Sequence, residues 1–250
     1  MLCKLGLFAR RLSVLLCTGL VLLPAGVHAE SVCIREDFTS LEAWTHKNFE
    51  KIEQSSTYTT GHREGRSVLQ AVTRNSASFV VHNQVFDVFQ CPVITWRWKV
   101  QNIYTKGDAA TKEGDDYPLR VYILFEYDPE EAGFAKRIKY GLIKNIYGQY
   151  PPDSSVNYIW ANRQRSQDPI PNPYTDRAMM IPVRSGTKGL GTWMSHTRHI
   201  VEDYEQAFGH PPPARAKLAV MSDSDNTGEQ AEAFVDFILV QEEDHGGAKE

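Results

Sequence analysis

The sequence predicts an all-β protein, a two-sheet antiparallel jelly-roll sandwich with one inserted helix and one short helix. Apolar and polar residues alternate along many short segments, turn-forming residues separate these segments, and no linker or internal repeat divides the chain. Many short strands with regular turns are typical of a sandwich or barrel, and such folds run to about 200–250 residues as one domain. We therefore expect a signal peptide at residues 1–29, one sandwich domain at residues 30–241 and a flexible polar tail at residues 242–250.

The strongest alternation occurs in residues 94–100 and 119–127. In the first segment, apolar side chains that include Trp96 and Trp98 alternate with threonine, arginine and lysine. Alternate residues of a strand face opposite sides of a sheet, so we expect both tryptophans to lie in the core. Shorter segments of the same character occur at residues 67–73, 77–82, 156–161, 178–183, 216–222 and 233–240.

Two segments predict helices. Residues 129–148 carry four apolar side chains spaced four apart, with basic residues on the opposite face. This spacing indicates a helix that packs its apolar stripe on the sandwich, and a membrane-surface helix is the alternative. Residues 200–208 predict a second, short helix that ends at Gly209 and the proline run at 211–213.

The first 29 residues have the three parts of a secretory signal. A basic start precedes the apolar run of residues 12–23, and small residues at Val27 and Ala29 precede Glu30. This order predicts cleavage before Glu30 and a periplasmic or secreted protein. The apolar run is shorter than a membrane span of about 20 residues, so the mature chain is expected to have no transmembrane segment. An uncleaved N-terminal anchor is the alternative.

Two of the four cysteines, Cys33 and Cys91, lie beyond the predicted signal peptide. An even number of cysteines in an exported chain predicts a disulfide. A pair of buried free thiols is the alternative. A catalytic or metal-binding role is weaker, because neither cysteine has another cysteine or a histidine nearby at ligand spacing.

Charge and motifs exclude several classes of protein. The formal net charge is −4, with 27 Lys and Arg against 31 Asp and Glu, which argues against nucleic-acid binding through a broad basic face. The chain has no G-x-S-x-G, H-E-x-x-H or C-x-x-C motif and no phosphate-binding loop. The candidate site residues therefore come from acidic turns and aromatic strands.

Two acidic turns stand out in the sequence. The one nearer the C-terminus, residues 223–229, which we call the second acidic turn, begins like a calcium loop. Asp223 and Asp225 stand at ligand spacing, but position twelve, where an EF-hand has a bidentate glutamate, is Phe234. One interpretation is a weak Ca²⁺ site through Asp223, Asp225 and backbone carbonyls. The other is a tight strand connection in which the acidic side chains accept backbone hydrogen bonds.

The first acidic turn, residues 114–118, places Asp115 and Asp116 just before a predicted strand. Paired carboxylates there can perform acid–base chemistry, bind a metal, or form ion pairs with Arg120 or Arg97. We expect Asp116 to be the partner of Arg120, because a buried arginine needs an acid and Asp116 is close in sequence.

Aromatic residues supply the remaining ligand-binding candidates. Arg120 is in phase with Tyr122 and out of phase with Val121, so charge and ring share the face opposite the apolar stripe. Tyr158 and Trp160 lie on another predicted strand, and we assign them to the same ligand-binding face. Aromatic rings that stack on sugars are a common means of glycan binding in β-sandwiches.

A set of short motifs extends over most of the chain beyond the predicted signal peptide. They are Asp37-Phe38 with Trp44, and residues 94–100, 114–122, 158–160, 201–209 and 220–228. These motifs resemble those of the bacterial exported proteins grouped as domain-of-unknown-function family 3047. The resemblance implies a jelly roll of carbohydrate-binding type, but it implies no established activity and no catalytic residues.

Three functions are open. The leading hypothesis is a non-enzymatic module that binds a glycan or another envelope ligand. The second is a jelly-roll glycoside hydrolase or lyase that pairs an aspartate of the first acidic turn with one of the second, which requires carboxylates about 5–10 Å apart beside an open cleft. The third is a structural or partner-binding envelope protein. No cofactor is predicted other than the weak Ca²⁺ site.

Overall fold

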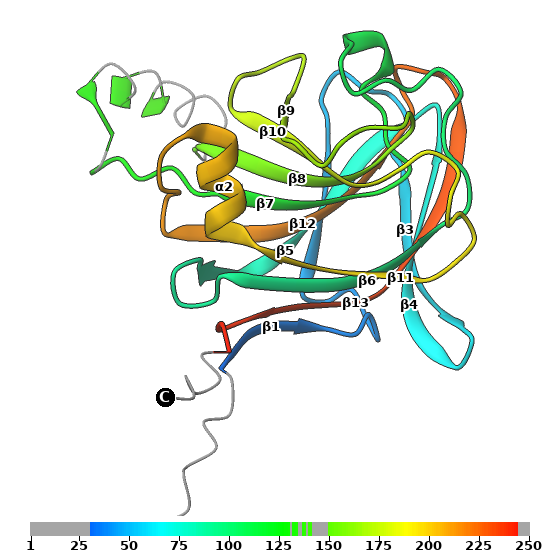
Figure 1. Cartoon of the computed structure of the whole chain (residues 1–250), viewed down its shortest axis with the longest axis horizontal. Helices are drawn as coiled ribbons and strands as arrows, with labels where there is room; N and C mark the ends of the chain where they lie inside the picture. Colours follow the sequence, from blue (N-terminus) through cyan, green and yellow to red (C-terminus); the bar gives the residue numbers. More distant parts are fainter. Residues whose placement is uncertain (1–30, 131, 135–136, 139, 142–149, 245–250) are drawn as a thin grey trace, which may run out of the picture.

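The computed structural model describes residues 31–244, apart from residues 131, 135–136, 139 and 142–149. Two β-sheets form the body of the molecule (Figure 1). The predicted all-β, two-sheet jelly-roll sandwich is confirmed. The predicted signal peptide and most of the polar tail lie outside the described residues. No helix in the described part of the chain is both long and apolar enough to cross a bilayer.

The six-stranded sheet has the order β11-β6-β13-β4-β3, with β1 paired to β13. All its pairs are antiparallel. Its strands are β1 (Val32–Glu36), β3 (Thr57–Arg63), β4 (Arg66–Arg74), β6 (Val93–Val100), β11 (Met194–His199) and β13 (Gln230–Gln241).

The seven-stranded sheet has the order β2-β5-β12-β7-β8-β10-β9. Its strands are β2 (Trp44–Asn48), β5 (Ala77–Asp87), β7 (Arg120–Phe125), β8 (Ser154–Ala161), β9 (Ile170–Pro171), β10 (Ala178–Ser185) and β12 (Arg215–Asp223).

One pair of this sheet departs from the predicted antiparallel arrangement. Strands β8 and β10 run parallel, with Ala178 opposite Ser155. The segment 162–177 returns the chain to the starting end of β8, and parallel neighbours require such a crossover.

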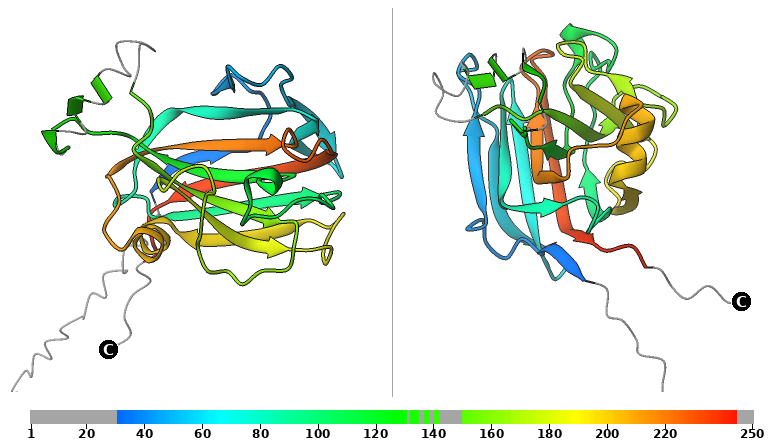
Figure 2. Two further views of the ribbon diagram at one scale, coloured as in Figure 1. Left: turned by 90° about the horizontal axis from the view of Figure 1, so that it is seen from above. Right: turned by 90° about the vertical axis from the view of Figure 1, so that its left-hand side faces the viewer.

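The predicted short helix is α2 (Ile200–Phe208), seen beside the strands in Figure 2. At the N-terminus of this helix, the side chain of His199 accepts a hydrogen bond from the Glu202 amide. Gly209 ends the helix with φ of 75°, and its N–H donates to the Glu205 carbonyl. A left-handed residue at this position is where glycine is favoured over any residue with a Cβ. A short 3₁₀ helix, η1 (Lys112–Gly114), precedes the first acidic turn.

The inserted helix predicted at residues 129–148 lies only partly within the described residues. The expectation that its apolar stripe packs on the sandwich is wrong for the two stripe residues that are described, because Phe134 is 80% and Ile138 is 51% exposed. The other two stripe residues, Leu142 and Ile146, lie outside the described residues. Among the described residues of this segment, Tyr140 is buried, and its ring centroid lies 4.1 Å from that of Tyr127.

Aromatic side chains fill the space between the sheets. Trp96 and Trp98 are fully buried, as predicted. Trp96 stacks on Tyr158 with ring centroids 5.0 Å apart, and Trp98 lies 6.2 Å from Trp160. The sequence-based placement of Tyr158 and Trp160 on a ligand-binding face is therefore wrong, because both belong to the core.

Each of these two side chains also has a partner for its polar atom. The Tyr158 hydroxyl donates to Asp203 Oδ2 at 2.8 Å, and the Trp160 indole N–H donates to the Gly186 carbonyl at 2.9 Å. Rings that satisfy their polar atoms internally can be buried completely. Their position in a strand with no charged residue was therefore a signal for the core rather than for a binding surface.

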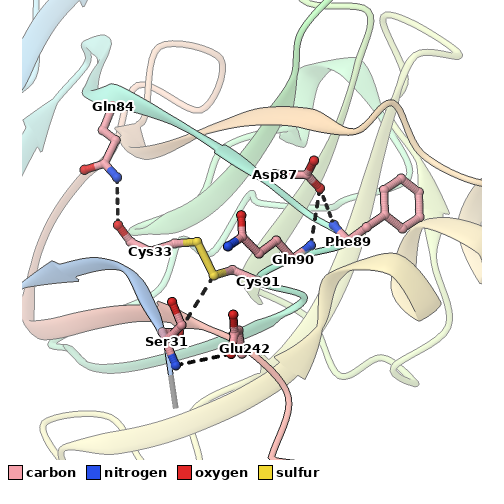
Figure 3. Close-up of a disulfide and its surroundings, with 8 residues drawn as sticks. All are labelled: Ser31, Cys33, Gln84, Asp87, Phe89, Gln90, Cys91 and Glu242. Atoms are coloured by element: carbon pink, nitrogen blue, oxygen red, sulfur yellow. Dashed lines mark hydrogen bonds between the residues drawn. A yellow bond between two sulfur atoms is a disulfide. The ribbon is translucent and has the colours of Figure 1, made fainter. Parts of the chain in front are cut away.

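The predicted disulfide joins Cys33 of β1 to Cys91 in the connection between β5 and β6 (Figure 3). The two Cα atoms are 6.3 Å apart, and the bridge spans 58 positions of sequence. The Cys33 carbonyl also accepts a hydrogen bond from the Gln84 side chain at 2.7 Å. The bridge therefore ties the first strand of one sheet to a segment that leaves the other sheet.

Candidate functional site

The two acidic turns meet at one end of the seven-stranded sheet. β7 and β12 are antiparallel neighbours, with Arg120 opposite Met221, so the start of β7 lies beside the end of β12. The Asp223 amide donates to the Tyr117 carbonyl at 3.2 Å, and the Tyr117 amide donates to Asp223 Oδ1 at 3.1 Å. Both acidic turns thus adjoin strands in the middle of the sheet, and the turns hold each other in place.

Asp116 binds the second turn to the first. It is fully buried. Its Oδ2 accepts from the Thr227 amide at 2.6 Å, and its Oδ1 accepts from the Asn226 side chain at 3.1 Å. The predicted ion pair between Asp116 and Arg120 is not formed, because the oxygens of Asp116 face the second turn. We conclude that Asp116 fixes the shape of the site.

The acid that pairs with Arg120 is Asp223. Arg120 Nε donates to Asp223 Oδ1 at 3.1 Å, and Nη2 donates to Oδ2. The two side chains are only 5% and 2% exposed. The guanidinium carbon lies 4.6 Å from the centroid of the Tyr117 ring and 5.7 Å from that of Tyr122, distances at which a cation is attracted to a ring. Sequence proximity suggested the wrong aspartate because β-sheet pairing brings a distant one closer.

Buried hydroxyl groups support the second turn from below. The Ser224 hydroxyl lies 2.8 Å from that of Thr73, and the Ser224 amide donates to the Ser76 carbonyl at 2.9 Å. Gly228 closes the turn with φ of 70° and donates to the Ser224 carbonyl at 2.8 Å. A turn bonded at so many points is a rigid platform for a binding site.

A pocket of about 440 Å³ opens beside these turns on the outer face of the seven-stranded sheet. We call it the acidic pocket. It brings together most of the predicted site residues, while Asp116 lies behind it and Tyr158 and Trp160 lie in the core. Among the residues that line it are Asp115, Arg120, Tyr122, Asn157, Tyr174 and Asp225.

Asp115 is a buried carboxyl group with an unused oxygen. It is 5% exposed. Its Oδ2 accepts from the Asn172 side chain at 2.7 Å, whereas Oδ1 has no hydrogen-bond partner among the described residues. Burial raises the pKa of Asp115, while Arg120, the hydrogen bond from Asn172 and the neighbouring Tyr117 hydroxyl oppose this shift. Asp115 therefore keeps one unused acceptor, which is buried beside the pocket.

Asn157 provides a second unused acceptor. It lies on β8 and is 1% exposed. Its Nδ2 donates to the Met179 carbonyl at 3.1 Å, and its Oδ1 has no partner in the described part of the chain. Sequence reasoning missed this residue, because β8 is buried on both faces. Asn157 is out of phase with Tyr158, so it faces the opposite side of the sheet from the core.

Aromatic side chains form part of the floor and rim of the acidic pocket. Tyr122 is half-buried on the sheet, and its hydroxyl contacts Met221 Sδ at 3.1 Å. Tyr174 is 56% exposed at the rim and donates a hydrogen bond to Asn226 Oδ1 at 2.9 Å. Phe49 also lines the pocket. The pocket thus combines ring faces with oxygen acceptors.

The predicted Ca²⁺ ligands lie together, but donors already occupy most of their oxygens. Asp116, Asp223 and Asp225 each place a carboxylate oxygen within 4.8 Å of the others. The oxygens of Asp223 accept from Arg120, and those of Asp116 accept from the second turn. Burial and the charge of Asp116 raise the pKa of Asp225. A cation at this position would have to displace Arg120 from Asp223.

The same contacts bear on the hydrolase hypothesis. Asp223 is neutralised by Arg120, and Asp116 is fully engaged with backbone and amide donors. Asp115 and Asp225 are the two aspartates of these turns whose carboxyl groups form no ion pair among the described residues, and burial raises the pKa of both. Acid–base chemistry in this pocket therefore depends on Asp115 and Asp225 alone.

We expect Asp115→Asn to raise the free energy of unfolding at neutral pH. Because burial raises the pKa of Asp115 in the folded state, the folded protein holds this proton more tightly than the unfolded chain does. The stability of the native protein therefore falls as pH rises from the ordinary value of 3.8 through the raised pKa. Asparagine does not titrate and keeps an oxygen for Asn172, so the variant avoids this loss.

Denaturant unfolding of both proteins between about pH 3 and pH 8 measures the effect. The difference in stability should be small at the acidic end and reach a plateau above the raised pKa. Asp176→Asn, which changes an exposed carboxyl group, is the control and should follow the native curve. A lower stability of Asp115→Asn over the whole range would show that the charge of Asp115 supports the fold.

Taken together, the facing sheets and the lined pocket define a jelly-roll sandwich protein with a polar pocket on the outer face of one sheet. The family model described as "Protein of unknown function (DUF3047)" matches residues 42–239, and the chain belongs to this family. The resemblance drawn from the sequence motifs is thus confirmed. Comparison with curated proteins gives no match.

Solved structures with a similar arrangement include sugar-binding proteins. The family 11 carbohydrate-binding module of the cellulase Lic26A-Cel5E of Clostridium thermocellum is 9% identical, with 88% of this chain and 98% of that chain covered at a TM-score of 0.40. The lectin from Bauhinia forficata in complex with GalNAc is 10% identical, with 85% and 98% covered at a TM-score of 0.42. The winged bean acidic lectin complexed with methyl-α-D-galactose is 9% identical, with 84% and 97% covered at 0.37. These low scores carry no inference about this chain.

Proposed function

We propose that this protein is an exported, non-enzymatic module that binds a glycan in the acidic pocket. The observation that carries the proposal is the pair of buried oxygens, Asp115 Oδ1 and Asn157 Oδ1, that lack partners among the described residues and belong to side chains lining one pocket. A buried acceptor left unsatisfied costs about 1–3 kcal/mol. A ligand that donates to both oxygens removes this cost.

A sugar fits the remaining chemistry of the pocket. Sugar rings present hydroxyl groups at their edges and C–H groups on their faces. The hydroxyl groups match the acceptors of Asp115 and Asn157, and the C–H faces match the rings of Tyr122 and Tyr174. Binding sites for small molecules commonly combine apolar walls with a few fixed polar groups.

Two further features support export and binding without catalysis. The basic, apolar and small-residue order of residues 1–29 is typical of a secretory signal, and disulfides such as Cys33–Cys91 persist in oxidising compartments. The engagement of Asp116 and Asp223 with neighbouring donors favours a binding role. A glycoside hydrolase that uses Asp115 and Asp225 is the second candidate.

A glycan array with the purified mature protein, followed by calorimetric titration of the best ligand, tests this proposal. Asp115→Asn turns the unused acceptor into a donor and should weaken binding by about tenfold or more, since a hydrogen bond to a charged group contributes about 1.5–3 kcal/mol. Asn157→Leu replaces the amide with an apolar side chain of similar volume that has no acceptor, and it should also weaken glycan binding.

The matched control is Asn102→Ala, because Asn102 lies away from the acidic pocket and bonds the Gln230 carbonyl. It should bind as the native protein does. Thermal unfolding of every variant separates lost binding from lost folding. Release of shorter sugars, detected by chromatography, would favour the hydrolase. The proposal fails if no glycan binds, or if both pocket variants bind normally.

A further inference from the structure

The outer face of the seven-stranded sheet carries a second pocket of about 480 Å³. We call it the basic pocket. Its lining includes Lys47 of β2, Lys217 of β12, and Phe79 of β5. Strands β5, β12 and β7 contribute residues to both pockets, so the two pockets share one face of one sheet.

Strand register shows that the two pockets are continuous. Phe79 of the basic pocket is paired directly with Met221 of the acidic pocket. On β7, Tyr122 lines the acidic pocket and Leu124, two residues further on the same face, lines the basic pocket. An apolar strip of Phe79, Met221, Tyr122 and Leu124 therefore joins the pockets.

The face is long enough for an extended ligand. On β12, Asp223 lines the acidic pocket and Lys217 lines the basic pocket. At a rise of roughly 3.4 Å per residue, these two positions are about 20 Å apart. A single sugar in the acidic pocket would leave the basic pocket empty, whereas a chain of sugars would occupy both.

The two ends carry opposite charge. Asp115 and Asp225 supply carboxyl groups at one end that form no ion pair among the described residues. At the other end, Lys47 and Lys217 are half-buried, and no carboxylate in the described part of the chain pairs with either.

The other ionisable groups of the basic pocket do not neutralise these lysines. Glu126, which also lines this pocket, is paired with Arg215 at 3.0 Å. Burial lowers the pKa of His82 and favours its neutral form, so His82 adds no charge to the pocket at neutral pH. The basic pocket is consequently complementary to an anionic group.

We propose that the ligand is an acidic oligosaccharide that lies along this face. Its hydroxyl-bearing end occupies the acidic pocket, its middle crosses the apolar strip, and an anionic substituent contacts Lys47 and Lys217. The proposal rests on the glycan-binding function argued above, and it adds the class of glycan and the direction in which the chain lies.

The test uses neutral oligosaccharides, from the dimer to the hexamer, that carry one uronic acid residue at one end, and the same oligomers with that carboxyl group methyl-esterified. Calorimetric titration of the native protein should show at least tenfold tighter binding of the longer acidic oligomers than of their esters. The dimer should show a smaller preference, because it cannot span both pockets. The preference should shrink as NaCl rises from about 50 mM to 500 mM, because salt screens charge.

The double variant Lys47→Ala, Lys217→Ala should lower the preference for the acidic oligomers over their esters to near one. The matched control, Arg74→Ala with Lys188→Ala, removes two exposed positive charges outside both pockets and should keep the preference. Thermal unfolding confirms that both double variants are folded.

The outcomes separate this proposal from the function on which it rests. Equal binding of acids and esters, or an unchanged preference in the lysine variant, overturns the acidic-ligand proposal and leaves glycan binding in place. The acidic-ligand proposal also fails if the protein binds neither the acidic oligomers nor their esters but does bind a neutral glycan on the array. Glycan binding in the acidic pocket is then still supported, provided that Asp115→Asn weakens binding of the neutral glycan. Failure of every glycan to bind overturns both proposals.

Discussion

Replacing Asp223 with alanine should lower the free energy of unfolding by about 3–5 kcal/mol, because it leaves a buried charge without its partner. Arg120 is 5% exposed on its side chain. Burial alone would lower the pKa of Arg120, but its surroundings, Tyr122 and Asp115 foremost, raise it, so the guanidinium remains charged. The Tyr117 amide also loses its acceptor on Asp223. For a chain of this size, the melting temperature should fall by roughly 10 °C.

Urea unfolding monitored by tryptophan fluorescence measures the loss. If Asp223→Ala does not fold, the milder Asp223→Asn keeps an acceptor for Tyr117 and should lose less. The double variant Arg120→Met, Asp223→Leu removes both charges and should recover most of the stability, since buried ion pairs are often replaceable by apolar residues. A loss below about 1 kcal/mol for Asp223→Ala would show that water reaches Arg120.

The same variants separate a structural role from a binding role. Asp223 lines the acidic pocket, but both its oxygens are engaged by Arg120 and Tyr117. We therefore expect any effect of Asp223→Asn on glycan binding to follow its effect on folding. Asp115→Asn should show the opposite pattern, with weaker binding and higher stability.

The alternating strands of the core could be predicted from the sequence to within a few residues. Residues 94–100 became β6, residues 216–222 became β12, and residues 200–208 became α2. Their alternation or helical spacing reflects burial of one face, which is the main signal available in one sequence. The disulfide followed from the count of cysteines and the expected compartment.

Strands with little burial were not predicted. β2 (Trp44–Asn48) buries only its first residue, and β3 (Thr57–Arg63) buries only Tyr58. Both lie at sheet edges, where one side of the strand has no neighbour and polar residues are tolerated. Hydrophobic periodicity carries no information about such strands, so they depend on long-range pairing.

The site was predictable in part for the same reason. The acidic turns and the phase of Arg120 and Tyr122 could be read locally. The pairing of Arg120 with Asp223 could not, because 103 residues separate them. The outward direction of Asn157 required the correct phase of β8, which is buried on both faces and therefore shows no simple alternation of apolar and polar residues.

Replacing both Cys33 and Cys91 with alanine should lower the free energy of unfolding by about 4 kcal/mol in the chain-entropy account of a loop of this length. The bridge spans 58 positions, and the enclosed segment contains β2, β3, β4 and β5. Without the bridge, the unfolded chain regains the freedom of that loop. Alanine is preferred to serine, because Cys91 is fully buried and a serine hydroxyl there would need a partner.

Urea unfolding of the double variant, and of the native protein with and without a reducing agent, measures this contribution. The reduced native protein should match the variant to within about 1 kcal/mol, because both lack the same constraint. The pockets lie on the seven-stranded sheet, whereas β1 pairs with β13 of the other sheet. Glycan binding per folded molecule should therefore be unchanged at temperatures where the variant is folded. A variant as stable as the oxidised native protein would show that the packing of β1 against β13 already fixes this end of the chain, with the disulfide adding no measurable constraint.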